Sequence, residues 1–188
     1  AAAATEQGHF LFRMEDTDQG RCRREFEDAI YKDLAWLGLA WETPVRRQSE
    51  HFDDYKHALG TLDNLGLLYP CFCTRAEILR EIESAVSAPH NQLKGPDGPI
   101  YPGTCRHLAK ADYKRRIGNG EPYALRLRVS TALEGAGTLT WADEGHGEIT
   151  ATPEIFGDVV LARKDTPASY HLACTWDDAV QGITLVTR

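Results

Sequence analysis

The sequence predicts an α/β protein in which a Rossmann-like core is interrupted by an inserted, cysteine-bearing α+β module. Three features lead to this prediction. A short apolar run is followed by amphipathic helical patterns, the middle of the chain carries three cysteines around a turn-rich loop, and the last part returns to strand and helix patterns. We therefore expect the core in residues 1–70 and 151–188, and the inserted module in residues 71–150.

The first element is the nearly continuous apolar run His9–Met14, which is typical of a strand buried on both faces of a parallel sheet. Such a strand needs neighbours, yet only eight residues precede it, and four of them are alanine. The sequence thus predicts that the first unit of the fold, with its N-terminal strand, is missing ahead of this run.

Two amphipathic helices are predicted next. The apolar residues of Arg23–Leu37 recur at steps of four, four and three, and Gly38 stands where a left-handed C-cap would lie. A similar pattern follows in residues 52–65, and Ser49 is the expected N-cap of that second helix.

A third helix is predicted over Thr74–Val86, because Thr74 and Glu77 have the spacing of a capping box. A proline- and glycine-rich stretch, Ala88–Gly103, predicts an exposed loop. The remaining elements are predicted as a polar helix at Ala109–Ile117, strands at Tyr123–Val129, Gly137–Trp141, Gly157–Leu161 and Tyr170–Thr175, a short helix at Asp177–Gly182 and a strand at Ile183–Arg188.

Composition excludes several classes of protein. With 188 residues, 42% hydrophobic and 26% charged, the chain fits an ordinary globular domain and not disorder, collagen or a coiled coil. The net charge of −7 excludes a global basic field that would hold nucleic acid non-specifically. No apolar run approaches the roughly 18 residues of a membrane span, and no signal peptide is present, so we expect a soluble, cytoplasmic protein without a membrane partner.

Basic residues occur in several groups on polar faces. Solvated surface is the simpler interpretation, and phosphate contacts to a tRNA are the alternative. The residues concerned are Arg21, Arg23, Arg24, Arg46, Arg47, Arg115 and Arg116.

Cys71, Cys73 and Cys105 offer three thiolates for a soft metal ion on either side of the turn-rich loop. A structural zinc site needs four ligands, and on ligand chemistry alone His107 is preferred to Tyr101, because imidazole is a much commoner zinc ligand than phenol. The alternative is that the cysteines are small hydrophobic core residues.

A charged cluster, Arg13–Asp18, follows the first predicted strand, where open α/β sheets bind their ligands. Glu15 could hold an ammonium group, whereas Asp16 and Asp18 could equally cap the following helix. Tyr170 and Arg188 are predicted on strands of the same sheet. Together with Glu15 they could recognise an amino acid, with Arg188 binding a carboxylate.

Four motifs, in this order and spacing, resemble the glutamate branch of class I aminoacyl-tRNA synthetases. Two further segments resemble the glutamyl-Q tRNA(Asp) synthetases, a truncated paralogous family, and full glutamate-tRNA ligases usually lack the first of these two. The four motifs are Arg13-Met-Glu-Asp-Thr-Asp18, Asp33-Leu-Ala-Trp-Leu-Gly38, Arg46-Arg-Gln-Ser-Glu50 and Tyr69-Pro-Cys-Phe-Cys-Thr-Arg75. The two segments are Tyr101-Pro-Gly-Thr-Cys-Arg106 and Pro167–Ala173 running into Asp177–Thr184.

The resemblance implies an enzyme, expected to be a monomer, that uses ATP with Mg²⁺ to activate L-glutamate as an adenylate. The glutamate is then transferred to the queuosine base of tRNA(Asp). By position, the family's glutamate-binding residues correspond to Glu15, Tyr170 and Arg188. Its zinc ligands correspond to Cys71, Cys73, Tyr101 and Cys105, which replaces the preference for His107.

The family's histidine-containing ATP motif and its lysine-rich loop are not found in the sequence. We therefore assign no catalytic or ATP-binding residue, and expect these 188 residues alone not to activate glutamate. Two alternatives stay open. One is a catalytic-domain fragment of a glutamate-tRNA ligase that charges the tRNA 3′ end, and the other is a non-catalytic, zinc-stabilised nucleic-acid-binding module.

Overall fold

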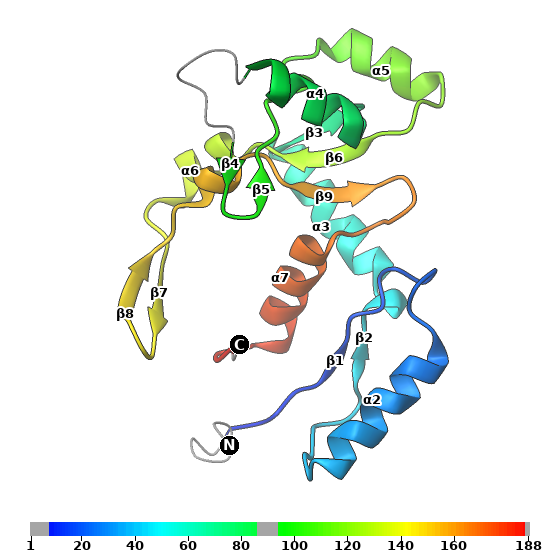
Figure 1. Cartoon of the computed structure of the whole chain (residues 1–188), viewed down its shortest axis with the longest axis vertical. Coiled ribbons are helices and arrows are strands. Elements are labelled where there is room, and N and C mark those ends of the chain that lie inside the picture. Colours follow the sequence, from blue (N-terminus) through cyan, green and yellow to red (C-terminus); the bar gives the residue numbers. More distant parts are fainter. Residues whose placement is uncertain (1–7, 86–93, 187–188) are drawn as a thin grey trace. The chain divides into compact units, whose positions relative to one another are not determined.

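The computed structural model describes residues 8–85 and 94–186 (Figure 1). Its helices are α2 (Arg24–Trp36), η1 (Gln48–Glu50), α3 (Phe52–Asn64), α4 (Arg75–Ala85), α5 (Lys110–Gly118), α6 (Val129–Ala136), η2 (Pro153–Phe156) and α7 (Tyr170–Gln181). Its strands are β1 (Arg13–Met14), β2 (Arg46–Arg47), β3 (Leu68–Cys71), β4 (Lys94–Gly95), β5 (Gly98–Pro99), β6 (Ala124–Leu127), β7 (Thr140–Asp143), β8 (Gly147–Thr150) and β9 (Val160–Arg163).

The chain divides into two compact units. The first unit comprises the described residues within 1–57 and 166–188, and the second comprises those within 58–165. None of the described helices combines the length and the apolar character that crossing a bilayer requires.

In the first unit, the apolar run that predicts a strand is regular only at its end. β1 pairs in parallel with β2, Arg13 opposite Arg46 and Met14 opposite Arg47. The residues before β1 are held by one backbone hydrogen bond, from the Glu42 amide to the Phe10 carbonyl at 3.0 Å, and by aromatic contacts. The ring of Phe12 meets those of Tyr31 and Trp41 edge to face at 5.6 and 5.9 Å between centroids. The strand prediction for His9–Met14 is therefore confirmed for its last two residues only.

Helix α2 confirms the helix predicted over Arg23–Leu37, and the chain turns at Gly38 with φ +71° as predicted. The amide of Gly38 donates to the carbonyl of Ala35 at 3.0 Å, which closes the last turn. The apolar face is less buried than the periodicity predicts, since Phe26 and Leu37 are 54% and 61% exposed.

Helix α7 corrects the prediction for the last part of the chain. A strand at Tyr170–Thr175 and a separate helix at Asp177–Gly182 were expected, but one helix covers nearly both segments. Ser169 starts it by accepting a hydrogen bond from the amide of Leu172 at 3.3 Å, and Gly182 ends it in a left-handed conformation. Residues 183–186 form no strand, and the rest of the expected strand Ile183–Arg188 lies outside the described residues.

The second unit is built on an antiparallel sheet with the strand order β3-β6-β9. Figure 1 shows β6 between the other two strands. These strands lie in or overlap the segments where the sequence predicts them, except that β3 was not predicted. The strand predicted at Gly137–Trp141 is present only from Thr140, where β7 pairs with the unpredicted β8.

The helices near this sheet are mostly where the sequence predicts them. Thr74 and Glu77 form the predicted capping box at the start of α4, since the Thr74 amide donates to Glu77 Oε2 at 2.7 Å and the Glu77 amide donates to Thr74 Oγ1 at 3.2 Å. Helix α3 is also confirmed, but Ser49 does not cap it, because Ser49 lies in η1. Helix α6 was not predicted. The expected loop contains a small hairpin, β4–β5, and its residues 86–93 lie outside the described part.

Candidate functional site

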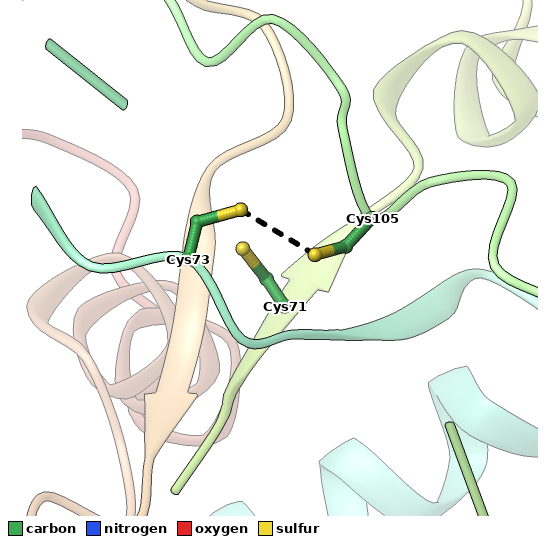
Figure 2. Close-up of side chains that lie close together, drawn as sticks. All are labelled: Cys71, Cys73 and Cys105. Carbon is green, nitrogen blue, oxygen red and sulfur yellow. Dashed lines mark hydrogen bonds between the residues drawn. The ribbon is translucent and has the colours of Figure 1, made fainter. Parts of the chain in front are cut away.

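Three cysteines of the second unit come together although the chain separates Cys105 from the other two. Cys71 ends β3, Cys73 follows it, and Cys105 comes after the β4–β5 hairpin. Their sulfur atoms all lie within 4.8 Å of one another, and Cys73 Sγ is 3.4 Å from Cys105 Sγ. Figure 2 shows the three sulfurs turned toward a common point. The structure thus brings together the three cysteines that the sequence singles out.

The side chain of Tyr101 joins this cluster. Its hydroxyl oxygen lies 3.5 Å from Cys73 Sγ and accepts a hydrogen bond from the Cys105 amide at 2.8 Å. Tyr101 is buried, whereas His107 is exposed. Among the histidines, cysteines and acidic residues of the described chain, the group at this point contains the three cysteines and not His107.

The pKa values of Cys71 and Cys73 are shifted in opposite directions. Burial acts to raise the pKa of Cys71, but interactions with the Tyr101 hydroxyl and the Arg126 guanidinium outweigh it and lower this pKa below its ordinary value. For Cys73, burial and the adjacent sulfurs raise the pKa to about 12. Burial, followed by the cysteine sulfurs, also raises the pKa of Tyr101. The raised pKa values of Cys73 and Tyr101 favour the neutral forms of these two groups.

The donor set fits a zinc ion. A tetrahedral centre with zinc–sulfur bonds of about 2.3 Å needs sulfur atoms roughly 3.8 Å apart. The sulfurs of Cys73 and Cys105 are 3.4 Å apart, and all three sulfurs lie within 4.8 Å of one another, which is close to that spacing. Three thiols and one phenol provide four donor atoms, so the group has the number of ligands that structural zinc takes.

A buried carboxylate, Asp158, organises the residues next to the cysteines. It is 3% exposed and accepts hydrogen bonds from Tyr69 Oη at 2.6 Å, from Arg106 Nε at 2.7 Å and from the Val129 amide at 3.0 Å. These bonds connect the residue after Cys105 to strand β3 and to the start of α6. Asp158 therefore stabilises the loop that carries Cys105.

In the first unit, the cluster after β1 is tied to helix α7. Arg13 Nη1 donates to Asp178 Oδ1 at 2.7 Å, and Arg13 Nη2 lies 3.3 Å from Glu15 Oε1. Glu15 also accepts a hydrogen bond from Cys174 Sγ at 3.3 Å. The Glu15 side chain is 39% exposed, so its carboxylate is held in place and still accessible.

Tyr170, predicted on a strand, is the first residue of α7 and lies one helical turn before Cys174. The pKa of Tyr170 is raised, first by the Cys174 thiol and then by the charge of Glu15. The structure thus brings Tyr170 and Glu15 together on either side of Cys174. Arg188, the third residue predicted to bind glutamate, lies outside the described residues.

Sequence reasoning missed a buried carboxylate, Asp177, that organises this unit. It is 0% exposed and binds Arg46 Nε at 2.8 Å, Tyr55 Oη at 2.9 Å and Gln48 Nε2 at 3.2 Å. Burial and the bond to Asp177 raise the pKa of Tyr55. The available signal was an aspartate three residues after Cys174, a spacing that places both on one face of a helix.

Two expectations about charged residues are wrong. Asp16 does not cap α2, because it accepts hydrogen bonds from the Ser49 amide at 2.8 Å and from Ser49 Oγ at 2.6 Å; nor does Asp18, which pairs with Arg21. Arg46 and Arg47 are not solvated surface, since their side chains are 12% and 21% exposed. Arg46 pairs with Asp177 and Asp54, and Arg47 pairs with Asp16, Glu27 and Glu50.

Comparison with known proteins shows which family this chain resembles. The family model described as "tRNA synthetases class I (E and Q), catalytic domain" matches residues 1–188. The glutamyl-Q tRNA(Asp) synthetase of Rhodobacter capsulatus is 42% identical over 187 residues, covering 96% of this chain and 64% of that protein. The glutamate–tRNA ligase of Hydrogenobaculum sp. is 39% identical over 186 residues, covering 99% of this chain and 38% of that protein.

A solved structure has the same fold. The glutamate tRNA ligase of Elizabethkingia meningosepticum superposes with a TM-score of 0.74 at 24% identity, over 97% of this chain and 37% of that one. The chain therefore spans less than two thirds of the length of these relatives. The family match over the whole chain, together with the relatives just named, shows that the chain belongs to the class I tRNA synthetases for glutamate and glutamine, as a mixed α/β catalytic domain.

Proposed function

We propose that this chain belongs to an enzyme that activates glutamate with ATP and transfers it to the queuosine base of tRNA(Asp). The observation that carries the proposal is the 42% identity to a glutamyl-Q tRNA(Asp) synthetase over 96% of the chain. The segment Tyr101–Arg106, which distinguishes this family from full glutamate-tRNA ligases, supports it as well. The enzyme acts as a monomer, with ATP and Mg²⁺ at groups that we do not assign.

Glutamate is bound in the first unit by Glu15, Tyr170 and Arg188. Glu15 attracts the ammonium group, Arg188 pairs with a carboxylate, and Tyr170 hydrogen-bonds the amino acid. Two buried polar atoms of the same unit, Arg13 Nε and Gln48 Oε1, have no hydrogen-bond partner. Unpaired buried polar atoms next to Glu15 and Cys174 support a polar ligand at this place, because a ligand or water would satisfy them.

A zinc ion is held in the second unit by Cys71, Cys73, Cys105 and Tyr101. When bound, it supplies structural cross-linking and no reaction chemistry, because four protein ligands leave no position for substrate. The protein residues carry the rest of the role. Tyr101 and Cys105 join the end of β3 to the loop after the β4–β5 hairpin, and so stabilise residues 71–150, which we assign as the inserted module.

A glutamate-tRNA ligase that charges the tRNA 3′ end is the second candidate. The specific observation in its favour is the 39% identity to such a ligase over 99% of the chain. The two candidates differ in the atom that receives glutamate, and therefore in which part of the tRNA is needed for labelling.

Labelling of tRNA tests the choice between these two functions. The protein should be prepared with any segments that flank this chain in its gene and incubated with ATP, labelled glutamate and tRNA. We expect label on queuosine-containing tRNA(Asp) even after its 3′-terminal adenosine has been removed, and none on queuosine-free tRNA(Asp). Label on tRNA(Glu) that requires the terminal adenosine would instead establish the ligase.

Replacing Glu15 by glutamine tests the glutamate site. Loss of the carboxylate removes the charge partner of the substrate ammonium group, and we expect the KM for glutamate to rise roughly 100-fold. Steady-state kinetics of the same preparation measures this effect. Glu42→Gln is the matched control, because Glu42 is exposed and pairs with His9 away from the cluster. An unchanged KM in Glu15→Gln would exclude Glu15 from the glutamate site.

A further inference from the structure

The side chain of Arg126 lies against the cysteine cluster from the neighbouring strand. On β6, Arg126 is opposite Tyr69 of β3, and Cys71 is two residues further along β3. Because alternate residues of a strand share a face, Arg126 and Cys71 lie on the same side of the sheet. The guanidinium carbon of Arg126 stands 3.9 Å above the ring centroid of Tyr101. Arg126 thus contacts one proposed zinc ligand, Tyr101, and lies on the same face of the sheet as another, Cys71.

With zinc bound, the cluster would carry an excess negative charge. Three thiolates and one Zn²⁺ leave one negative charge, and Cys71 and Cys105 are only 2% and 5% exposed. A buried charge is costly unless a neighbouring charge or hydrogen bond compensates for it. The compensation must therefore come from the protein.

Arg126 differs from Arg106 in having no acidic partner among the described residues. Arg106 pairs with the Asp158 carboxylate at 2.7 Å. Arg126 Nη1 donates only to the backbone carbonyl of Asp158, at 2.7 Å, and no carboxylate of the described residues forms an ion pair with it. Its Nε is buried without a hydrogen-bond partner. The positive charge of Arg126 is thus not neutralised by an acidic side chain of the described residues, and it lies over the ring of Tyr101, whose hydroxyl is 3.5 Å from Cys73 Sγ.

We propose that Arg126 is a positioning residue of the metal centre, which balances the excess negative charge of the loaded cluster and holds the Tyr101 ring. This inference rests on the proposed zinc site. A guanidinium over an aromatic face is attracted by the ring and restricts its orientation, so the stack aims the Tyr101 hydroxyl at the metal. Residues that touch metal ligands commonly set the affinity for the metal, and their loss typically costs about 10- to 100-fold.

Arg128, the residue that follows β6, provides a matched control. It too stacks on a tyrosine, with its guanidinium carbon 4.8 Å from the centroid of Tyr69, and donates to a backbone carbonyl, that of Arg106, at 3.0 Å. Tyr69 is not a ligand in the proposed centre. Replacing Arg128 therefore measures the effect of losing a stacked arginine in this module without an effect on a zinc ligand.

The experiment is a zinc titration of the purified 188-residue chain at fixed pH against a chelator of known affinity. We expect Arg126→Gln to bind zinc roughly 10- to 100-fold more weakly than the wild type. Arg126→Lys keeps the charge, and its zinc affinity should stay within about fivefold of the wild-type value. The zinc affinity of Arg128→Gln should stay within about threefold of it. Far-UV circular dichroism of the zinc-loaded variants checks that each is folded.

The outcomes separate this inference from the zinc assignment itself. Wild-type protein that binds no zinc would refute the proposed metal site. Zinc binding by the wild type with equal affinity in Arg126→Gln would refute the role of Arg126 alone. If Arg126→Lys binds zinc as weakly as Arg126→Gln, the effect comes from packing and not from charge, and the inference about Arg126 would be overturned. If Arg126→Gln does not fold, Arg126→Lys still tests the inference, because a loss of more than about fivefold in its zinc affinity would overturn it.

Discussion

Replacement of Cys73 by serine is expected to release zinc from the protein and to unfold much of residues 58–165. Cys73 Sγ lies 3.4 Å from Cys105 Sγ and 3.5 Å from the Tyr101 hydroxyl, so it connects the two chain segments that form the cluster. Structural zinc contributes on the order of 10 kcal/mol of apparent binding free energy in small metal modules. Metal analysis should fall from one zinc per chain to none, and amide hydrogen exchange should accelerate throughout the module.

Cys22→Ser is the control for this variant, because Cys22 is an exposed free cysteine of the first unit. It should keep one zinc and the wild-type exchange pattern. A Cys73→Ser protein that retains one zinc with unchanged protection would exclude Cys73 as a ligand, and a wild-type protein that holds no zinc would leave the cysteines as core residues. A second pair of variants identifies the fourth ligand. Tyr101→Phe should bind zinc more weakly than the wild type, and His107→Ala should bind it equally well. The reverse result would make His107 the fourth ligand.

Replacement of Asp177 by asparagine is expected to lower the free energy of unfolding by about 3 to 5 kcal/mol. Asp177 is fully buried, and its carboxylate accepts hydrogen bonds from Arg46, Gln48 and Tyr55. Asparagine keeps the size of the side chain but removes the charge, so Arg46 is left partly buried with only Asp54 as an acidic partner. Urea denaturation monitored by circular dichroism measures the change.

Asp178→Asn provides the adjacent comparison. The Asp178 side chain is 38% exposed and pairs with Arg13 at 2.7 Å, so solvent screens the interaction and its loss should cost about 1 kcal/mol or less. A larger loss of stability in Asp177→Asn than in Asp178→Asn would then be due to the burial of Asp177, because both variants remove one carboxylate charge. Equal destabilisation by the two variants would contradict the role assigned to Asp177.

Much of the helical structure follows from local patterns. The apolar periodicity of Arg23–Leu37, the left-handed Gly38 and the capping box of Thr74 and Glu77 each involve residues at most one or two helical turns apart, and each is confirmed. Helix α6 escaped the same reasoning because its start depends on a distant group, with the Val129 amide donating to Asp158 at 3.0 Å. No local pattern can contain that information.

The error at α7 has a related cause. Tyr170–Thr175 alternates in a way that suits a strand, and the short segment does not distinguish strand from helix by periodicity alone. The cap at Ser169 and the left-handed Gly182 decide for one helix. These local signals were present in the sequence, and joining them across Asp177 would have predicted α7.

The candidate sites divide in the same way between sequence and tertiary structure. Motif order and residue chemistry were enough to indicate the family, the three-cysteine cluster and the importance of Glu15 and Tyr170. The resemblance already indicated Tyr101 in place of His107, and the folded chain places the Tyr101 hydroxyl 3.5 Å from Cys73 Sγ. Only the folded chain shows that Cys174 bonds to Glu15 and that Arg46 pairs with Asp177 at a separation of 131 residues. Ligand type is a property of the side chain itself, whereas burial and charge pairing arise when distant segments exclude water together.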